Sequence, residues 1–290
     1  MLKRNNQYCG IVMNIERDFI HEVVNNFYNS IMQDGDLCGY SDASPANGNY
    51  DDEIYQKLYA LKYLPAYYFE YCVLATKLAN RLKNNGADEI NVSSFGCGLY
   101  PDYFALLHNL QDIEFDYYGY DICKWKTRNL LPESEDNLCL KTMSISDITQ
   151  TALDDTDVFI FPKSLGDIAE NINMPSFARK IASTPKDTVY FLNSFITVNH
   201  NLNRHHVELF SHFHDALLKQ GFTTDDPSDE TFYRGDHEFQ GLKGINYGFD
   251  YPDGIHLCEE GAELDCKCRV VHSPVMKNSY MNYQILEYTR

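Results

Sequence analysis

Two glycines and one aspartate carry the strongest chemical signal in this sequence. Residues 89–102 read as an apolar strand that runs into the turn Gly96-Cys97-Gly98. Glycine accepts positive φ and has no Cβ, so such a turn lets a ligand pack against main-chain atoms. The aromatic-rich residues 115–121 end in Asp121, and an acid at the end of the second strand of a doubly wound fold commonly receives ribose hydroxyls. The pattern therefore predicts a site for a ribose-containing cofactor.

The residue at position 101 argues against a dinucleotide. The dinucleotide fingerprint is Gly-x-Gly-x-x-Gly, and this chain has Pro101 in place of the third glycine. Proline has no N–H to offer to a pyrophosphate. A cofactor without phosphates needs only close backbone approach, a ribose acid and an apolar adenine slot, and it fits the sequence better.

Three segments together resemble the class I S-adenosylmethionine-dependent methyltransferases. They are the turn Phe95-Gly96-Cys97-Gly98, the acid Asp121 and the later strand 157–165, and the resemblance covers residues 85–195. It implies an α/β fold, a three-layer sandwich around a mostly parallel, seven-stranded Rossmann-like sheet with a helical N-terminal cap. It also implies S-adenosylmethionine as the cofactor.

The resemblance assigns roles to individual residues. The glycine turn would border the methionyl part of the cofactor, Asp121 would hold the ribose, and the residues after Asp121 would flank the adenine. The family usually has an acid two residues before the first glycine, where this chain has Ser94, so Asp102 is the nearest acid for the cofactor's amino group. The predicted cofactor contacts are Phe95, Gly96, Cys97, Gly98, Asp102, Asp121, Ile122, Trp125, Asp147 and Phe161.

The loop after the fourth strand is the predicted place of acceptor contact. It reads Phe161-Pro162-Lys163-Ser164 and lacks the Asn/Asp-Pro-Pro-Tyr motif of methyltransferases that act on the amino groups of bases and glutamine. Ligands in open α/β sheets bind at the carboxyl ends of the strands, so Lys163 and Ser164 are the predicted catalytic residues. The alternative is a simple strand-to-helix turn in which Ser164 caps the next helix.

Helical patterns precede the first strand. Apolar residues recur at helical spacing over 15–31, residues 35–49 form a breaker stretch, and a second helical pattern covers 51–83, broken or bent at Pro65. We expect residues 1–85 to form a helical cap and residues 86–290 to form the cofactor-binding domain.

Tyrosines at a spacing of four lie on one face of the second helical pattern. They are Tyr59, Tyr63, Tyr67 and Tyr71. Tyr63 and Tyr67 are the predicted substrate contacts. The alternative is aromatic core packing, with hydroxyls that reach partners at its edge.

The remaining pattern completes a parallel sheet. Strands are predicted over 138–142 and 188–195, and a helix over 203–220 whose histidines are expected to be exposed. A closing strand over 280–288 matches the antiparallel strand that the family inserts at the sheet edge.

A C-terminal elaboration is predicted over residues 222–279. A hairpin there would place His256 and Cys258 opposite Cys268 and Cys266. The spacing differs from the Cys-x2-Cys of structural zinc sites, and buried cysteine also packs as a small apolar residue. We predict no metal site and leave zinc binding by this set open.

Charge and composition limit the partners. The 290-residue chain has 24 basic and 42 acidic residues, a formal net charge of -18. Nucleic-acid binders usually show a basic footprint, so nucleic acid is disfavoured, and a small molecule or a protein is the expected acceptor. No apolar run is long enough to span a membrane, no signal peptide is evident and the nine cysteines do not read as a disulfide framework, so we expect a cytoplasmic protein. The sequence does not indicate the oligomeric state.

The predicted activity is methyl transfer from S-adenosylmethionine to a small molecule or protein. Three alternatives stay open: an NAD-dependent oxidoreductase, an aminocarboxypropyl transferase that uses the same cofactor, and a non-enzymatic binding protein with this fold.

Overall fold

The computed structural model describes residues 11–34, 50–196, 200–228, 232–233 and 281–290. The helices of these residues are α1 (Arg17–Ile31), α2 (Glu53–Asn85), α3 (Pro101–Asn109), α4 (Gln150–Asp154), α5 (Leu165–Asn171), α6 (Met174–Ala182) and α7 (His200–Lys219). The strands are β1 (Glu89–Phe95), β2 (Glu114–Asp121), β3 (Leu138–Thr142), β4 (Val158–Pro162), β5 (Thr188–Ile196), β6 (Phe232–Tyr233) and β7 (Met281–Thr289).

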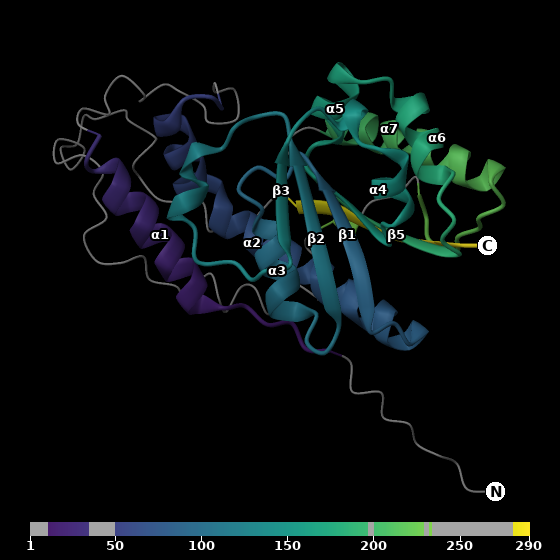
Figure 1. Cartoon of the computed structure of the whole chain (residues 1–290), viewed down its shortest axis with the longest axis horizontal. Helices are drawn as coiled ribbons and strands as arrows, with labels where there is room; N and C mark the ends of the chain where they lie inside the picture. The colour runs from purple at the N-terminus through teal and green to yellow at the C-terminus, as the bar shows by residue number, and fades with distance from the viewer. Residues whose placement is uncertain (1–10, 35–49, 197–199, 229–231, 234–280) are drawn as a thin grey trace, which may run out of the picture.

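The strands form one sheet in the order β3-β2-β1-β4-β5-β7-β6 (Figure 1). Strands β1 to β5 are parallel, and β7 lies antiparallel between β5 and the two-residue β6. The order of the five parallel strands, 3-2-1-4-5, is that of doubly wound dinucleotide-binding sheets. The predicted α/β fold with a mostly parallel sheet is confirmed, and the closing strand predicted over 280–288 is β7.

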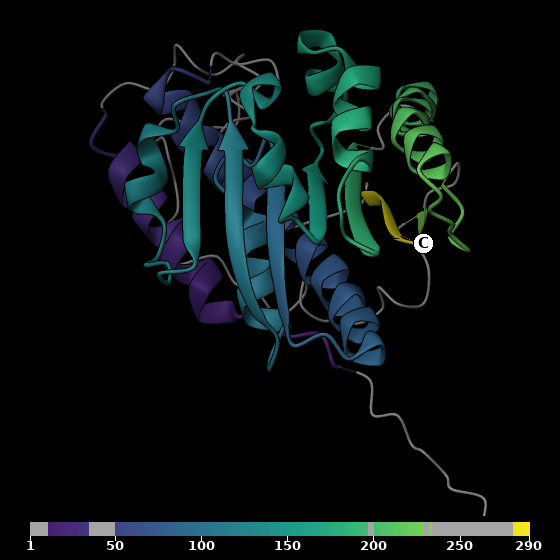
Figure 2. The same cartoon turned by 45° about the vertical axis from the view of Figure 1, so that its right-hand side comes forward.

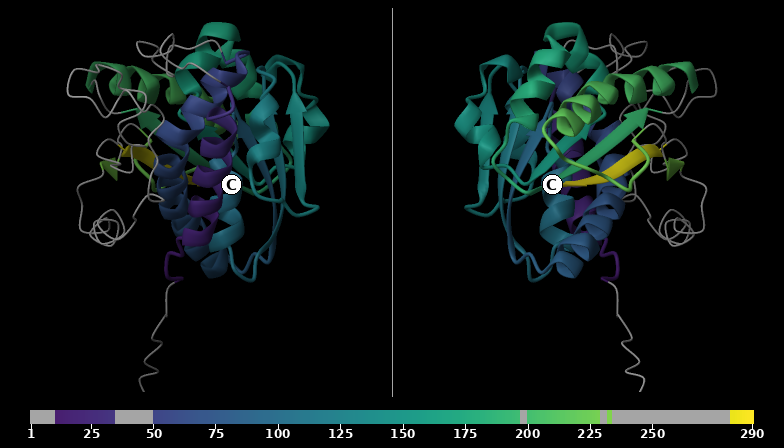
Figure 3. Two further views of the ribbon diagram at one scale, coloured as in Figure 1. Left: turned by 90° about the vertical axis from the view of Figure 1, so that its left-hand side faces the viewer. Right: turned by 90° about the vertical axis from the view of Figure 1, so that its right-hand side faces the viewer.

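Helices cover both faces of the sheet and enclose two separate cores (Figures 2 and 3). Side chains of a strand alternate between the faces, so Val158 and Ile160 join the core beneath α1, α2 and α3. Phe159 and Phe161 point the other way, into the core beneath α5, α6 and α7. The molecule is therefore a sandwich of helices, sheet and helices.

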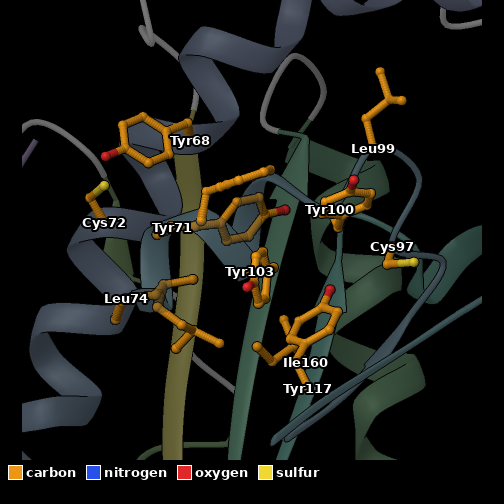
Figure 4. Packing of buried hydrophobic residues seen from close by; sticks show 14 of the residues in the cluster. Tyr68, Tyr71, Cys72, Leu74, Cys97, Leu99, Tyr100, Tyr103, Tyr117 and Ile160 are labelled. Carbon is orange, nitrogen blue, oxygen red and sulfur yellow. The ribbon is translucent and has the colours of Figure 1, made fainter. Parts of the chain in front are cut away.

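The first core is rich in buried tyrosines, which Figure 4 shows between helix α2 and the sheet. Tyr103 of α3 and Tyr117 of β2 lie edge to face with ring centroids 5.4 Å apart. The hydroxyl of Tyr117 donates to Asp102 at 2.8 Å, and that of Tyr103 to Asn137 at 2.9 Å. Buried phenols therefore keep their hydrogen bonds inside this core.

Helix α2 is continuous through Pro65, so of the two predicted outcomes, a break or a bend, the break does not occur. An internal proline costs a helix about 3 kcal/mol because one hydrogen bond is lost. Apolar side chains on both sides of Pro65, such as Leu64 and Phe69, are buried against the sheet and against α1, and this burial compensates the loss. The Asp52 side chain caps the first turn, and Gly86, at φ 70°, ends the helix.

The N-terminal helices share their core with the sheet. Val23 and Phe27 of α1 and Leu74 of α2 belong to the same buried cluster as Val92 of β1. The division of the chain at residue 85 stays a prediction, as does the elaboration over 222–279, most of which lies outside the described residues.

Candidate functional site

A cavity of about 440 Å³ opens at the carboxyl ends of β1, β2 and β4, between these strands and helix α2. Strand β1 leads into α3 on one face of the sheet, and its neighbour β4 leads into α5 on the other. Open α/β sheets bind their ligands where the connections diverge in this way. The volume lies in the usual range for small-molecule sites, about 300–1,000 Å³.

The glycine turn lines the cavity, and both glycines have positive φ, 75° at Gly96 and 55° at Gly98. A Cβ on Gly96 would lie 2.7 Å from Cβ of Ser164, and one on Gly98 would lie 3.3 Å from Cζ2 of Trp125. The glycines therefore let two side chains of the site itself approach the turn, in addition to exposing backbone to a ligand.

Asp121 lies at the centre of the predicted cofactor contacts. Its carboxylate accepts hydrogen bonds from the backbone N–H of Gly98 and of Cys123, each at 2.8 Å. Burial raises the pKa of Asp121, and these two donors and the Arg128 guanidinium oppose the shift. Each carboxylate oxygen has further lone pairs, so Asp121 can accept hydroxyl groups from a ligand in the cavity.

Arg128 is a residue next to the site that the sequence analysis did not select. Its Nε and Nη2 atoms donate to the carbonyl oxygen of Gly98 at 3.1 and 2.8 Å. Its guanidinium lies 5.7 Å from the centroid of the Tyr100 ring. Arg128 therefore fixes the backbone of the glycine turn through two hydrogen bonds to the Gly98 carbonyl.

Gln56 of helix α2 forms hydrogen bonds with two segments beside the cavity. Its Nε2 donates to the carbonyl oxygens of Tyr50, at 2.5 Å, and Lys124, at 3.0 Å. Its Oε1 accepts from the backbone N–H and the hydroxyl of Thr127, both at 3.2 Å. All the polar atoms of this buried amide are thus used.

Asp102 lies below the turn and does not line the cavity. It is buried in helix α3 and accepts the hydrogen bond from Tyr117. Burial raises the pKa of Asp102 to about 6, against the lowering effect of Ser94 and Tyr117. The contact of Asp102 with the cofactor's amino group stays a prediction. In the structure Asp102 lies next to Ser94.

Three other predicted cofactor contacts also have side chains outside the cavity lining. Phe95 and Phe161 pack against each other in the second core, with ring centroids 5.2 Å apart. Asp147 is exposed, and Met143, Ser144 and Ile145 line the cavity in its place. The remaining predicted contacts line the cavity: Gly96, Cys97, Gly98, Asp121, Ile122 and Trp125.

Lys163 and Ser164 both line the cavity and both have partners in the protein. The Lys163 ammonium lies 2.5 Å from a carboxylate oxygen of Glu70 and donates to the carbonyl of Phe195 at 3.3 Å. The Ser164 hydroxyl donates to the carbonyl oxygen of Phe95 at 2.5 Å and does not cap helix α5. Lys163 is therefore a positive charge neutralised by Glu70, and Ser164 closes the glycine turn against β4.

Tyrosines of helix α2 form one wall of the cavity. Tyr63 and Tyr67, the predicted substrate contacts, stack with ring centroids 5.6 Å apart, and Tyr59 and Tyr71 also line the wall. Burial raises the pKa values of Tyr59, Tyr67 and Tyr71 well above the ordinary value, so these phenols stay neutral. Tyr71 in addition hydrogen-bonds Ser194 at 2.9 Å.

His206 reaches the cavity, contrary to the expectation that the histidines of helix α7 are solvated. A Cβ on Gly166 would lie 2.4 Å from its Nε2 atom, so the imidazole packs directly on the first turn of α5. Asp167 and Glu170 of the same helix also line the cavity. No spacing in the sequence links His206 to this helix, because only the packing of α7 on α5 brings them together.

No group of three metal-ligating side chains occurs among the described residues. The set His256, Cys258, Cys266 and Cys268 lies outside them. In the part of the chain that the structure describes, no helix is long and apolar enough to cross a membrane.

Comparisons with known proteins give structural matches only. No known family matches the sequence, and no curated protein matches it. The plantazolicin methyltransferase BpumL, solved with a desmethylPZN analogue and SAH, is 13% identical, with 93% of this chain and 97% of that chain covered and a TM-score of 0.44. The precorrin-6y C5,15-methyltransferase from Geobacter metallireducens is 10% identical, with 76% and 87% covered and a TM-score of 0.36.

The fold assignment rests on the chain's own strand order. A mostly parallel sheet, an antiparallel C-terminal strand and a glycine turn after β1 are the features that the resemblance implied, and the structure adds the strand order 3-2-1-4-5 and the place of β7 between β5 and β6. The chain therefore has a Rossmann-like α/β fold, as the resemblance to the class I S-adenosylmethionine-dependent methyltransferases predicted.

Proposed function

We propose that the protein is an S-adenosylmethionine-dependent methyltransferase that acts on a small molecule or a protein. The observation that carries the proposal is the position of Asp121, whose buried carboxylate faces the cavity next to the glycine turn. An acid at the end of β2 is where doubly wound folds receive ribose hydroxyls.

The residues of the cavity fit this cofactor better than a dinucleotide. Pro101 is the first residue of α3 and lines the cavity, so the helix N-terminus there has one N–H fewer to offer to a pyrophosphate. Ile122, Trp125 and Ile145 supply apolar surface for an adenine. When bound, S-adenosylmethionine supplies a methyl group that is already electrophilic.

The protein's own contribution is to bind, orient and exclude water. Asp121 and the glycine turn would hold the cofactor, with Arg128 fixing the turn, and the tyrosine wall would shelter the acceptor. Aligning two bound reactants supplies much of the acceleration in such a reaction, so few catalytic groups are needed. In this proposal Lys163 and Ser164 act by shaping the acceptor side, since both are already hydrogen-bonded within the protein.

Trp125, the single tryptophan of the chain, lines the cavity and reports on binding without any label. We expect S-adenosylmethionine and S-adenosylhomocysteine to change its fluorescence saturably, with calorimetry giving the same dissociation constants. NAD should have no effect. Tighter binding of NAD than of S-adenosylmethionine would favour the NAD-dependent alternative.

Asp121→Asn and Asp147→Asn are a matched pair for this experiment. Both aspartates were predicted cofactor contacts, but only Asp121 lines the cavity. Asp121→Asn should weaken cofactor binding about tenfold or more, since one charged acceptor is replaced by an amide, and Asp147→Asn should leave it within about twofold. Gly96→Val is a poorer test because any Cβ at Gly96 meets Ser164.

Two alternatives are separated by products and partners. Methyl transfer adds about 14 Da to an acceptor, whereas aminocarboxypropyl transfer adds about 101 Da, by the formulae of the groups transferred. A chain that binds no cofactor but retains a stable partner would be a non-enzymatic member of the fold.

A further inference from the structure

A buried ion pair lies where the cavity wall formed by helix α2 meets the end of β4. The Lys163 ammonium is 2.5 Å from a carboxylate oxygen of Glu70, and the two side chains are only 7% and 2% exposed. Lys163 lines the cavity, whereas Glu70 belongs to helix α2 and does not line it. The pair therefore brings one positive charge to the cavity surface and places the negative charge that neutralises it one layer deeper.

The backbone of Lys163 has a conformation that lysine rarely adopts. Its φ is 57°, in the left-handed region, and its N–H donates to the carbonyl oxygen of Phe161 at 2.9 Å, which makes a tight turn directly after β4. This conformation is unfavourable for any residue with a Cβ, and strain of this kind is found mostly at functional sites. Lysine therefore occupies the position for its side chain and not for its backbone.

The Lys163 ammonium is fixed by three different groups. Besides its contact with Glu70, it donates to the carbonyl oxygen of Phe195 at 3.3 Å, and it lies 4.8 Å from the centroid of the Tyr67 ring. An ammonium group within about 6 Å of a ring centroid is attracted by the negative face of the ring. The charge of Lys163 thus has a defined place at the cavity wall, and it occupies a ring face that would attract another cation.

The proposed cofactor would bring a second positive charge to this part of the cavity. With the ribose at Asp121, the sulfur, which one carbon joins to the ribose, would lie on the side of the ribose away from the adenine. The cavity extends along the glycine turn to Lys163, because the neighbouring Ser164 packs on the turn, with its Cβ 2.7 Å from a Cβ placed on Gly96. A lysine charge without a partner there would repel the sulfonium.

We propose that Glu70 determines the selectivity of the site between S-adenosylmethionine and S-adenosylhomocysteine, by neutralising the charge of Lys163. This inference rests on the proposed function and adds to it a residue outside the cavity lining. The two compounds share their amino and carboxylate groups and differ by one methyl group and one positive charge. A site without this neutralisation would bind the neutral product more tightly than the charged cofactor.

The affinities of both compounds for three variants test the proposal. A cavity of about 440 Å³ is roughly 10 Å across, so at an effective dielectric constant of about 20 a unit charge at its wall changes the affinity for a cation about tenfold. Glu70→Gln leaves the Lys163 charge and should lower the preference for S-adenosylmethionine over S-adenosylhomocysteine about tenfold. Lys163→Met leaves the Glu70 charge, frees the Tyr67 ring and should raise the preference about tenfold. Glu70→Leu combined with Lys163→Met should keep the preference within about threefold of the wild-type value.

The preference is a ratio of two dissociation constants, so it is insensitive to a loss of stability. Partial unfolding weakens the apparent binding of both compounds by the same factor. Calorimetry with the full chain would be run at pH 6 for Glu70→Gln, to keep Lys163 protonated, and at pH 8 for Lys163→Met, to keep Glu70 ionised, with the wild type at both. Sinefungin, which carries an ammonium group in place of the sulfonium, should follow S-adenosylmethionine in every variant, and this separates charge from the methyl group.

Glu114→Gln is the matched control, because it removes the same charge at a distant place. Glu114 is the exposed first residue of β2, at the opposite end of the sheet from the cavity. Its substitution should leave the preference within about twofold of the wild-type value, since solvent and salt screen such a charge.

The possible failures are distinguishable. If the wild type binds neither compound, the proposed function is refuted. If it binds both, but Glu70→Gln and Lys163→Met leave the preference unchanged or shift it in the same direction, only the present inference is refuted. If Glu70→Gln does not fold, Lys163→Met and the double variant decide: a raised preference in the first alone supports the inference, and equal preferences refute it.

Discussion

The buried ion pair between Glu70 and Lys163 makes a strong prediction about stability. The side chains are 2% and 7% exposed, and the charged atoms lie 2.5 Å apart. Removing one partner of such a pair leaves an uncompensated buried charge, which costs about 3–5 kcal/mol. Glu70→Gln should therefore be strongly destabilising, although glutamine has the same shape as glutamate.

The expected change in melting temperature follows from the length of the chain. Unfolding entropy of about 2.1 cal/mol/K per residue gives about 0.6 kcal/mol/K for the 290 residues. A loss of about 3–5 kcal/mol then lowers Tm by about 5–8 °C, which differential scanning calorimetry resolves easily.

A double variant separates charge burial from the loss of contacts. Glu70→Leu combined with Lys163→Met replaces both charges by apolar groups of similar size, and its Tm should equal the wild-type value or exceed it by up to about 7 °C. Asp187→Asn is the exposed control, since Asp187 is 89% exposed and 3.8 Å from Arg290. It should cost less than about 1 kcal/mol. A Glu70→Gln variant as stable as Asp187→Asn would refute the reasoning.

Two further predictions concern the turn and the acid below it. Gly96→Ala should cost more stability than Gly86→Ala in urea unfolding, by about 1–3 kcal/mol, because both glycines have φ near 70° but only the Cβ at Gly96 meets Ser164; equal costs would contradict this account. Asp102 has a pKa of about 6 when folded, above its ordinary value, so the folded state binds its proton more tightly and stability falls as pH rises from about 4 to about 6. The wild-type protein should lose up to about 3 kcal/mol more over this window than Asp102→Asn, and parallel pH profiles would show that Asp102 does not titrate there.

Local patterns predicted the elements well. The apolar run before Gly96, the aromatic run before Asp121 and the helical spacing of the tyrosines in α2 are each visible in a few consecutive residues. The helix does not break at Pro65, one of the two outcomes expected there, because the burial of α2 outweighs one lost hydrogen bond and depends on elements distant in the chain.

The candidate site was predicted only in part, because some of its residues lie next to strands and others depend on contacts between distant elements. Asp121 ends β2, Trp125 lies shortly after β2 and Lys163 follows β4 directly, so the sheet brings them to one edge. Tyr50 and His206 reach the cavity, and Arg128 reaches the glycine turn, only through contacts between separate elements, and no short motif records such contacts. Phe95 and Phe161 were assigned from their neighbours in the sequence, although strand alternation turns their rings into the core.

Gln56 has a consequence for how the segments beside the cavity can move. Its amide group forms hydrogen bonds with Tyr50 in one segment and with Lys124 and Thr127 in another. One side chain therefore connects the two segments that carry Tyr50 and Trp125. Neither can swing away alone without breaking hydrogen bonds of a buried side chain. Any displacement of one segment that keeps these hydrogen bonds must therefore move the other segment and the start of helix α2 with it.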